Sequence, residues 1–159
     1  MQKHKKNKIE ARMQIKRDFY LNQLIDRKQN KMIKIISVIR RCGKSYLLSE
    51  LFTQHLLDNE LQIRGYNVDV GEVNVENNKS TEIDFVANIG NKRYYIQSAL
   101  SLPTSEKMMQ EEKSLLSIRD GFKKIIITKS NLLQTYQDEN GIIIMDLKEF
   151  LLNKNSLDT

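Results

Sequence analysis

Hydrophobic positions recur every three or four residues in three long stretches of the chain, which is typical of amphipathic helices. In one stretch Leu48, Phe52 and Leu56 follow at intervals of four, and the pattern continues past Asp58 to Gly65, a residue type that commonly ends helices. A final short helix is predicted because Asp146, with Glu149 three residues later, resembles a capping box. The predicted helices cover residues 11–29, 47–64, 105–119 and 147–152.

Shorter stretches have patterns typical of strands. The alternation from residue 82 to 89 predicts that Ile83 and Phe85 face one side of a sheet and Asp84 the other. In the strand before it, Val68 and Val70 are expected to point inward. Predicted strands cover residues 32–36, 66–74, 82–89, 93–100, 124–127 and 142–145, with turns at 76–80 and 90–92. The order of elements predicts an α/β fold.

Composition narrows the class of protein. The chain has 159 residues, of which 40% are hydrophobic and 29% charged, as expected for one modest globular domain, alone or with an appendage. No apolar run approaches the ~18 residues of a membrane span, and no apolar run follows the basic N-terminus as in a secretory signal. Cys42 is the single cysteine, so no internal disulfide forms. We therefore expect a soluble, cytoplasmic protein with no membrane partner.

Charge is unevenly distributed along the chain. Residues 1–45 contain 14 Lys and Arg against three acidic residues, whereas the rest contains 12 against 17. This asymmetry indicates two pieces of different origin. The basic arm is a candidate for binding nucleic acid or nucleotide phosphates, and the alternative is a solvated tail that keeps the protein soluble.

A nearly complete phosphate-binding motif lies between a predicted strand and a predicted helix. Residues 38–45 read V-I-R-R-C-G-K-S, close to the pattern G-x-x-x-x-G-K-[ST]. In that pattern Gly43 lets backbone amides approach phosphate, Lys44 reaches the β- and γ-phosphates of ATP, and Ser45 is a magnesium ligand. The remaining candidate nucleotide-binding residues are Arg40, Arg41 and Cys42.

The motif departs from the pattern at its first position. Val38 replaces a glycine, and a β-branched side chain is poorly suited to positive φ. No apolar strand ending in a magnesium-holding Asp follows within a nucleotide-binding core, and Asp146 is better explained as a helix cap. A vestigial loop and a functional site for ATP with magnesium both stay open.

Several short sequence segments resemble those of one protein family. Residues 16–21, 24–28 and 39–45 resemble the start of a family of bacterial and archaeal AAA-type ATPases. Residues 82–87, 95–97, 110–111 and 150–152 resemble that family's far C-terminal domain, which is uncharacterised and similar in fold to PD-(D/E)XK nucleases. The resemblance implies a P-loop piece at 1–57, a nuclease-like domain at 58–152 and a tail at 153–159. It also implies an internal deletion near residues 57–59, inside one continuous helix.

The resemblance implies an α-β-β-β-α-β core with a carboxylate site. Glu60 on the first helix, Asp84 on the second strand and Gln97 on the third occupy the expected positions, with Asp84 as the candidate metal ligand. Ala99 stands where these nucleases place a catalytic Lys. Glu72 would be a substitute carboxylate, and Lys107 or Lys113 a substitute amine.

These features predict a truncated, catalytically inactive member of the ATPase family with weak phosphate or nucleic-acid contact. One alternative is an ATP-binding protein or ATPase subunit completed by a partner. Another is a magnesium-dependent nuclease with a displaced Lys. The oligomeric state does not follow from the sequence.

Overall fold

The computed structural model divides the chain into two compact units, Met1–Lys34 and Ile35–Thr159, which are described separately. It describes residues 17–29, 32–33, 35–37, 42–75, 79–99, 105–130 and 132–158, without the side chains of 74, 75, 79, 105, 107 and 110. The two packing units meet in the sequence before the phosphate-loop motif. The boundary predicted between residues 57 and 58 is of another kind, since it separates segments of different inferred evolutionary origin, and it stays a prediction.

In the first unit, α1 (Asp18–Asp26) lies within the helix predicted for residues 11–29, whose first six residues lie outside the described part. The strand predicted for residues 32–36, a range that includes the boundary between the two units, is wrong, because its described residues form no strand and Ile33 and Ile35 are 92% and 89% exposed. A short apolar run becomes a strand only where a neighbouring strand accepts its backbone hydrogen bonds.

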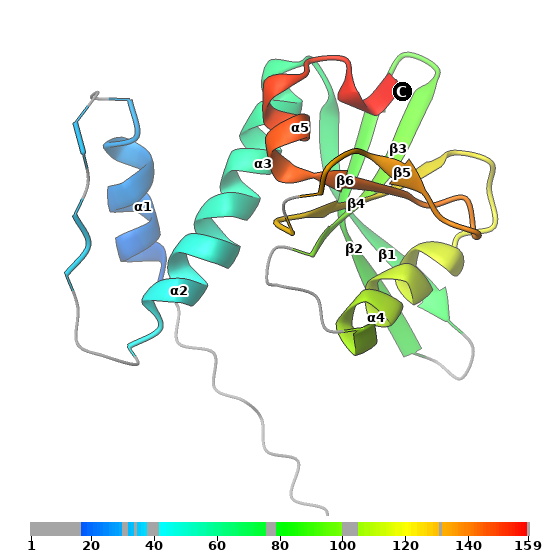
Figure 1. The fold of residues 1–159 in the computed structure, drawn as a ribbon, viewed down its shortest axis with the longest axis horizontal. Helices are drawn as coiled ribbons and strands as arrows, with labels where there is room; N and C mark the ends of the chain where they lie inside the picture. Colours follow the sequence, from blue (N-terminus) through cyan, green and yellow to red (C-terminus); the bar gives the residue numbers. More distant parts are fainter. Residues whose placement is uncertain are drawn as a thin grey trace, which may run out of the picture. The chain divides into compact units, whose positions relative to one another are not determined.

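The second unit contains a six-stranded mixed sheet of order β1-β2-β3-β4-β6-β5 (Figure 1). The first three strands pair antiparallel, β3, β4 and β6 pair parallel, and β5 pairs antiparallel with β6. The strands are β1 (Asn67–Val75), β2 (Lys79–Ile89), β3 (Lys92–Ala99), β4 (Lys123–Thr128), β5 (Tyr136–Gln137) and β6 (Ile143–Asp146). Strand β5 was not predicted, since two residues give no alternation to detect.

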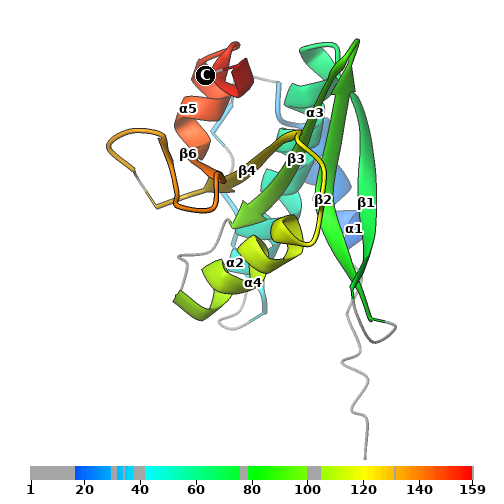
Figure 2. The ribbon, with the colours of Figure 1, turned by 90° about the vertical axis from the view of Figure 1, so that its right-hand side faces the viewer.

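Helices cover both faces of this sheet (Figures 1 and 2). On one face, Leu57 and Leu61 of α3 (Thr53–Ile63) and Phe150 of α5 (Leu147–Leu152) pack in one hydrophobic cluster, the α3-side cluster. On the other face, Leu115 of α4 (Ser105–Leu116) packs with Ile126 in the α4-side cluster. The buried run of β4 is thus covered on both sides, which confirms the prediction made from its continuous apolar sequence.

The helix that precedes the sheet runs without interruption from Lys44 to Ile63. It comprises α2 (Lys44–Tyr46), a π-helical segment η1 (Leu47–Phe52) and α3, and it passes Asp58 without a break, as predicted. The Thr53 hydroxyl donates to the Leu48 carbonyl at 2.9 Å, so it satisfies an acceptor within the wider π turn. Gly65, with φ of +88°, follows the helix and turns the chain into β1.

A β-bulge interrupts the pairing of β1 with β2. The register shifts between Asp69 and Gly71, so that two residues of β2, Asp84 and Phe85, oppose Val70. Two predictions fail for this reason. Val70 is 73% exposed, and Ile83 packs in the α4-side cluster whereas Phe85 packs in the α3-side cluster. An extra residue reverses the faces of a strand, because its side chains alternate with a period of two.

Gly71 is required at the bulge because the neighbouring strand approaches closely. A Cβ atom there would lie 2.8 Å from Val86 Cγ2 and 3.1 Å from Ile83 Cβ. We expect Gly71→Ala to lower the free energy of unfolding by about 1 to 2 kcal/mol, measured by urea denaturation. The matched control is Gly121→Ala, whose Cβ would meet nothing within 4 Å. An equally small effect of both substitutions would contradict the close approach.

The residues after α5, expected to be a tail, belong to the fold. In the 3₁₀ turn η2 (Ser156–Asp158), Ser156 and Leu157 are buried, and Leu157 joins the α3-side cluster. One carboxylate oxygen of Asp158 accepts hydrogen bonds from Lys92 Nζ at 2.6 Å and from the Tyr94 hydroxyl at 2.7 Å. The C-terminal turn is therefore attached to the beginning of β3.

This attachment depends on pH. The hydrogen bond from Lys92, and then that from Tyr94, hold the pKa of Asp158 below its ordinary value of 3.8. Because the folded-state pKa is the lower one, the contact stabilises the fold above pH 3.8 and is lost as pH falls through the lowered pKa. We expect Asp158→Asn to lower the melting temperature at neutral pH and this difference to vanish in acid. A difference independent of pH would contradict the assignment.

Candidate functional site

Asp84 lies at the bulge of β2 and accepts hydrogen bonds from the third strand. Its Oδ2 accepts from the backbone N–H of Ser98 at 2.8 Å and from the Ser98 hydroxyl. Ser98 and Gln97 are neighbours on β3, so their side chains project from opposite faces of the sheet. The Asp84 carboxylate therefore accompanies Ser98 and is turned away from the Gln97 side chain.

The Gln97 amide is fixed at both ends. Its Oε1 accepts from the backbone N–H of Asp84 at 3.0 Å, and its Nε2 donates to Glu111 Oε2 of α4 at 2.6 Å. The reverse amide orientation would place an NH₂ group against an N–H and an oxygen against a carboxylate, so the network determines the orientation. With Gln97 only 6% exposed, its oxygen faces the backbone rather than a site for a cation.

Ala99, at the position where the resemblance implies Lys, is completely buried in the α4-side cluster with Tyr95 and Leu115. Of the two substitute amines, Lys113 is exposed on the last turn of α4, and the Lys107 side chain lies outside the described part. Within the described ranges, no group of three or more His, Cys, Asp or Glu residues is placed to hold a metal ion. The arrangement satisfies buried polar groups, as a structural network does.

The other predicted carboxylates have different partners. Glu60 pairs with Arg64 Nε at 2.8 Å on the same helix. Glu72 lies opposite Glu82 in the β1–β2 ladder, and both are exposed. The structure thus brings together Asp84 and Gln97 of the predicted set, through the Asp84 backbone, and it gives Glu60 a separate role.

Three residues of these networks were missed by sequence reasoning. Ser98 and Glu111 have no local pattern that signals their contacts, although Glu111 is within a stretch that resembles the family. Arg64 connects α3 to the C-terminal region: it donates to Ser156 Oγ at 3.1 Å, to the Lys154 carbonyl at 3.4 Å and to the Phe150 carbonyl. Its guanidinium carbon lies 4.3 Å from the Phe150 ring centroid.

The phosphate-loop motif is described from Cys42 onward. Gly43 has φ of +81° and precedes the helix that begins at Lys44, whose first amides point toward the loop. The side chains of Lys44 and Ser45 are exposed. Val38, Arg40 and Arg41 lie outside the described residues, so the replacement of the first glycine stays a sequence observation.

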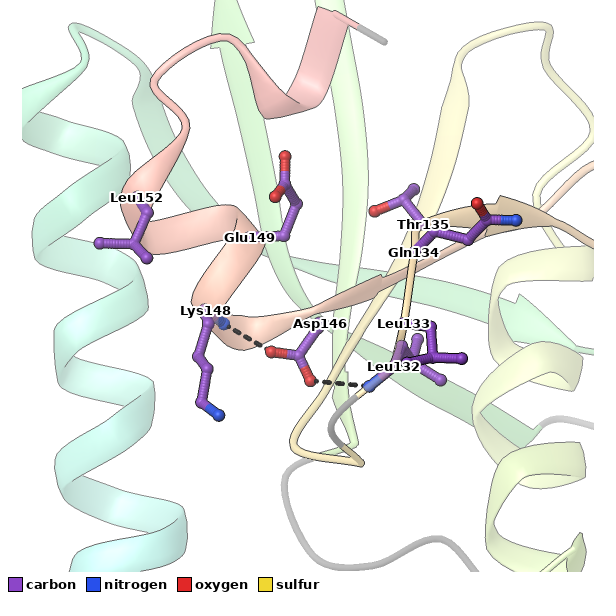
Figure 3. Close-up of a pocket in the computed structure, with 8 residues that line it drawn as sticks. All are labelled: Leu132, Leu133, Gln134, Thr135, Asp146, Lys148, Glu149 and Leu152. Atoms are coloured by element: carbon purple, nitrogen blue, oxygen red, sulfur yellow. Dashed lines mark hydrogen bonds between the residues drawn. The ribbon is translucent and has the colours of Figure 1, made fainter.

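A pocket of about 350 Å³ lies where the loop after β4 meets α5 (Figure 3). Asp146, at its base, accepts from Lys148 N at 2.8 Å and from Leu132 N at 3.3 Å. This confirms that Asp146 caps α5. The lining combines apolar and charged side chains without a convergent set of catalytic groups: Leu132, Leu133, Gln134, Thr135, Asp146, Lys148, Glu149 and Leu152.

Comparison with known proteins gives one similar sequence and no assigned activity. No family model matches the chain. An uncharacterised protein of Haemophilus influenzae is 39% identical over 93 residues, which is 58% of this chain and 21% of that protein. The chain therefore matches about a fifth of the length of this relative. In the described part of the structure, every helix is too short or too polar to cross a membrane.

Proposed function

We propose that this chain is a truncated relative of AAA-type ATPases whose nuclease-like domain is catalytically inactive. The order helix, three strands, helix, strand in α3 to β4 supports the nuclease-like arrangement. This support concerns architecture, and the inactivity rests on the side chains.

The observation that carries the proposal is the fixed Gln97 amide beside a buried Ala99. Magnesium-dependent cleavage needs converging oxygen ligands and an activated water. Here Gln97 presents its NH₂ group to Glu111 and its oxygen to the Asp84 N–H, while Oδ2 of Asp84 accepts two hydrogen bonds from Ser98. Hydrogen bonds that join β2, β3 and α4 therefore occupy the position where a nuclease would place its metal ligands.

Plasmid nicking with magnesium or manganese tests this proposal. We expect no cleavage above the background of a matched preparation, and no difference between wild type and Asp84→Ala. The control is Asp69→Ala, an exposed acidic residue of β1. Metal-dependent nicking that is lost in Asp84→Ala and kept in Asp69→Ala would establish the nuclease alternative.

Residual phosphate contact at the loop is the second part of the proposal. Gly43 in a left-handed conformation, ahead of a helix beginning with exposed Lys44 and Ser45, favours contact with an anion. We expect ATP to bind with a Kd on the order of millimolar, the weak end of the affinity scale, because few charge-assisted contacts are available.

Titration of a fluorescent ATP analogue, with and without magnesium, measures this contact. Lys44→Ala is expected to weaken binding, whereas Lys113→Ala, another exposed lysine, leaves it unchanged. A micromolar, magnesium-dependent Kd that Lys44→Ala abolishes would favour a genuine ATP-binding subunit. If Lys44→Ala leaves binding unaffected, the loop does not contact ATP.

A further inference from the structure

The beginnings of β3 and β4 meet at one end of the sheet. The two strands are parallel, with Tyr94 opposite Lys123 and Tyr95 opposite Lys124. The turn at residues 90–91 and the loop 117–122 therefore lie side by side. Gln97 and Ala99 belong to the other end of β3, so this surface is separate from the network of the candidate site.

Basic side chains gather at this end. Of the described residues in the two loops and the first strand positions, five are Lys or Arg, and all except the half-buried Lys124 are exposed: Lys92, Arg93, Arg119, Lys123 and Lys124. Two carboxylates neighbour these five basic groups: Asp158 is ion-paired with Lys92 at 2.6 Å, and Asp120 accepts a hydrogen bond from the Tyr95 hydroxyl at 2.6 Å. The surface keeps an excess of positive charge.

An aromatic ring lies among these cations. Phe122 is 40% exposed, and the guanidinium carbon of Arg93 is 5.6 Å from its ring centroid. Arg93 Nε donates to Asn88 Oδ1 at 2.7 Å, which holds the guanidinium beside the ring. An exposed ring next to a positioned cation is the combination on which the bases of single-stranded nucleic acids stack.

We propose that this basic-aromatic surface binds single-stranded nucleic acid without sequence preference. A base stacks on Phe122, while Arg93 and Lys123 contact the neighbouring phosphates. An acidic peptide would use the cations alone, and the exposed ring therefore favours nucleic acid. The inference does not depend on the inactive site or on the phosphate loop, because it requires neither cleavage nor ATP.

Fluorescence anisotropy of a labelled oligothymidylate of about 16 nucleotides tests binding by the full chain. We expect Phe122→Ala and Arg93→Ala each to weaken binding about tenfold, within the range typical of losing one stacked base. Leu133→Ala, an exposed apolar residue elsewhere, and Lys113→Ala are the matched controls and should bind as wild type. Affinity should also fall steeply between about 50 and 200 mM salt.

The chain contains no tryptophan, so Phe122→Trp provides a single fluorescent reporter at the surface. We expect oligothymidylate to quench it, and polyglutamate at equal charge concentration not to. Quenching by polyglutamate alone would replace the proposal with an acidic-peptide site. Binding that persists in Phe122→Ala and Arg93→Ala, but is lost when Lys3, Lys5 and Lys6 become Ala, would assign nucleic-acid contact to the basic arm and overturn the proposal.

Discussion

Replacing Arg64 by Ala is expected to lower the free energy of unfolding by about 3 kcal/mol, measured by urea denaturation. The Arg64 side chain is only 5% exposed and bonds to Glu60, two backbone carbonyls and Ser156. The substitution leaves a carboxylate without its partner and removes the Arg64 donor from two part-buried acceptors, the Phe150 carbonyl and the Ser156 hydroxyl. The expected loss is at the low end for buried ion pairs, because Glu60 is 23% exposed and reaches water.

Two control variants separate charge from geometry. Arg64→Lys keeps the charge but loses the planar fork, so it should recover only part of the loss. Arg119→Ala, an exposed arginine, should change stability by less than about 0.5 kcal/mol. The account also predicts faster proteolysis of residues 153–159 in Arg64→Ala. Equal stability of Arg64→Ala and Arg119→Ala would contradict the role assigned to Arg64.

Replacing Asp84 by Ala is expected to cost about 2 to 3 kcal/mol of stability. The carboxylate accepts from both the N–H and the hydroxyl of Ser98, which is 6% exposed, and these donors would lose their acceptor. Asp84→Asn should cost less, because its amide oxygen can still accept one of the two hydrogen bonds.

Whether Asp84→Ala lowers or raises stability distinguishes a structural role of Asp84 from a catalytic one. A carboxylate kept for catalysis commonly destabilises the fold, so its removal leaves stability unchanged or raises it. Asp69→Ala, at an exposed position of the edge strand, is the matched control and should be nearly neutral. A more stable Asp84→Ala would contradict a structural network and favour a catalytic or metal-binding site.

Most elements of the second unit could be predicted from periodicity. The buried run of β4, the Asp146 cap of α5 and the uninterrupted helix past Asp58 all follow from local sequence. The bulge at Asp84 could not be predicted, because the alternation of residues 82–89 continues through it while the pairing partner shifts. The strand expected at residues 32–36 failed for the opposite reason, since its pattern is present but no described strand pairs with it.

The two strands that carry Asp84 and Gln97 were predicted, but the contacts of these side chains were not. The sequence places Asp84 and Gln97 on neighbouring strands, and the structure agrees. Which face each side chain takes depends on the bulge, and the contacts of Gln97 depend on Glu111 from a separate helix. Such long-range contacts have no local sequence signal, so the two hydrogen bonds of the Gln97 amide could not be predicted.

Calorimetric titration of the wild-type chain with magnesium tests the central claim most directly, because it asks whether Asp84 and Gln97 hold a metal without assuming any substrate. The account predicts no saturable heat attributable to this site, and identical traces for wild type and Asp84→Ala. One saturable site with a Kd below about a millimolar, absent in Asp84→Ala and present in Asp69→Ala, would contradict it.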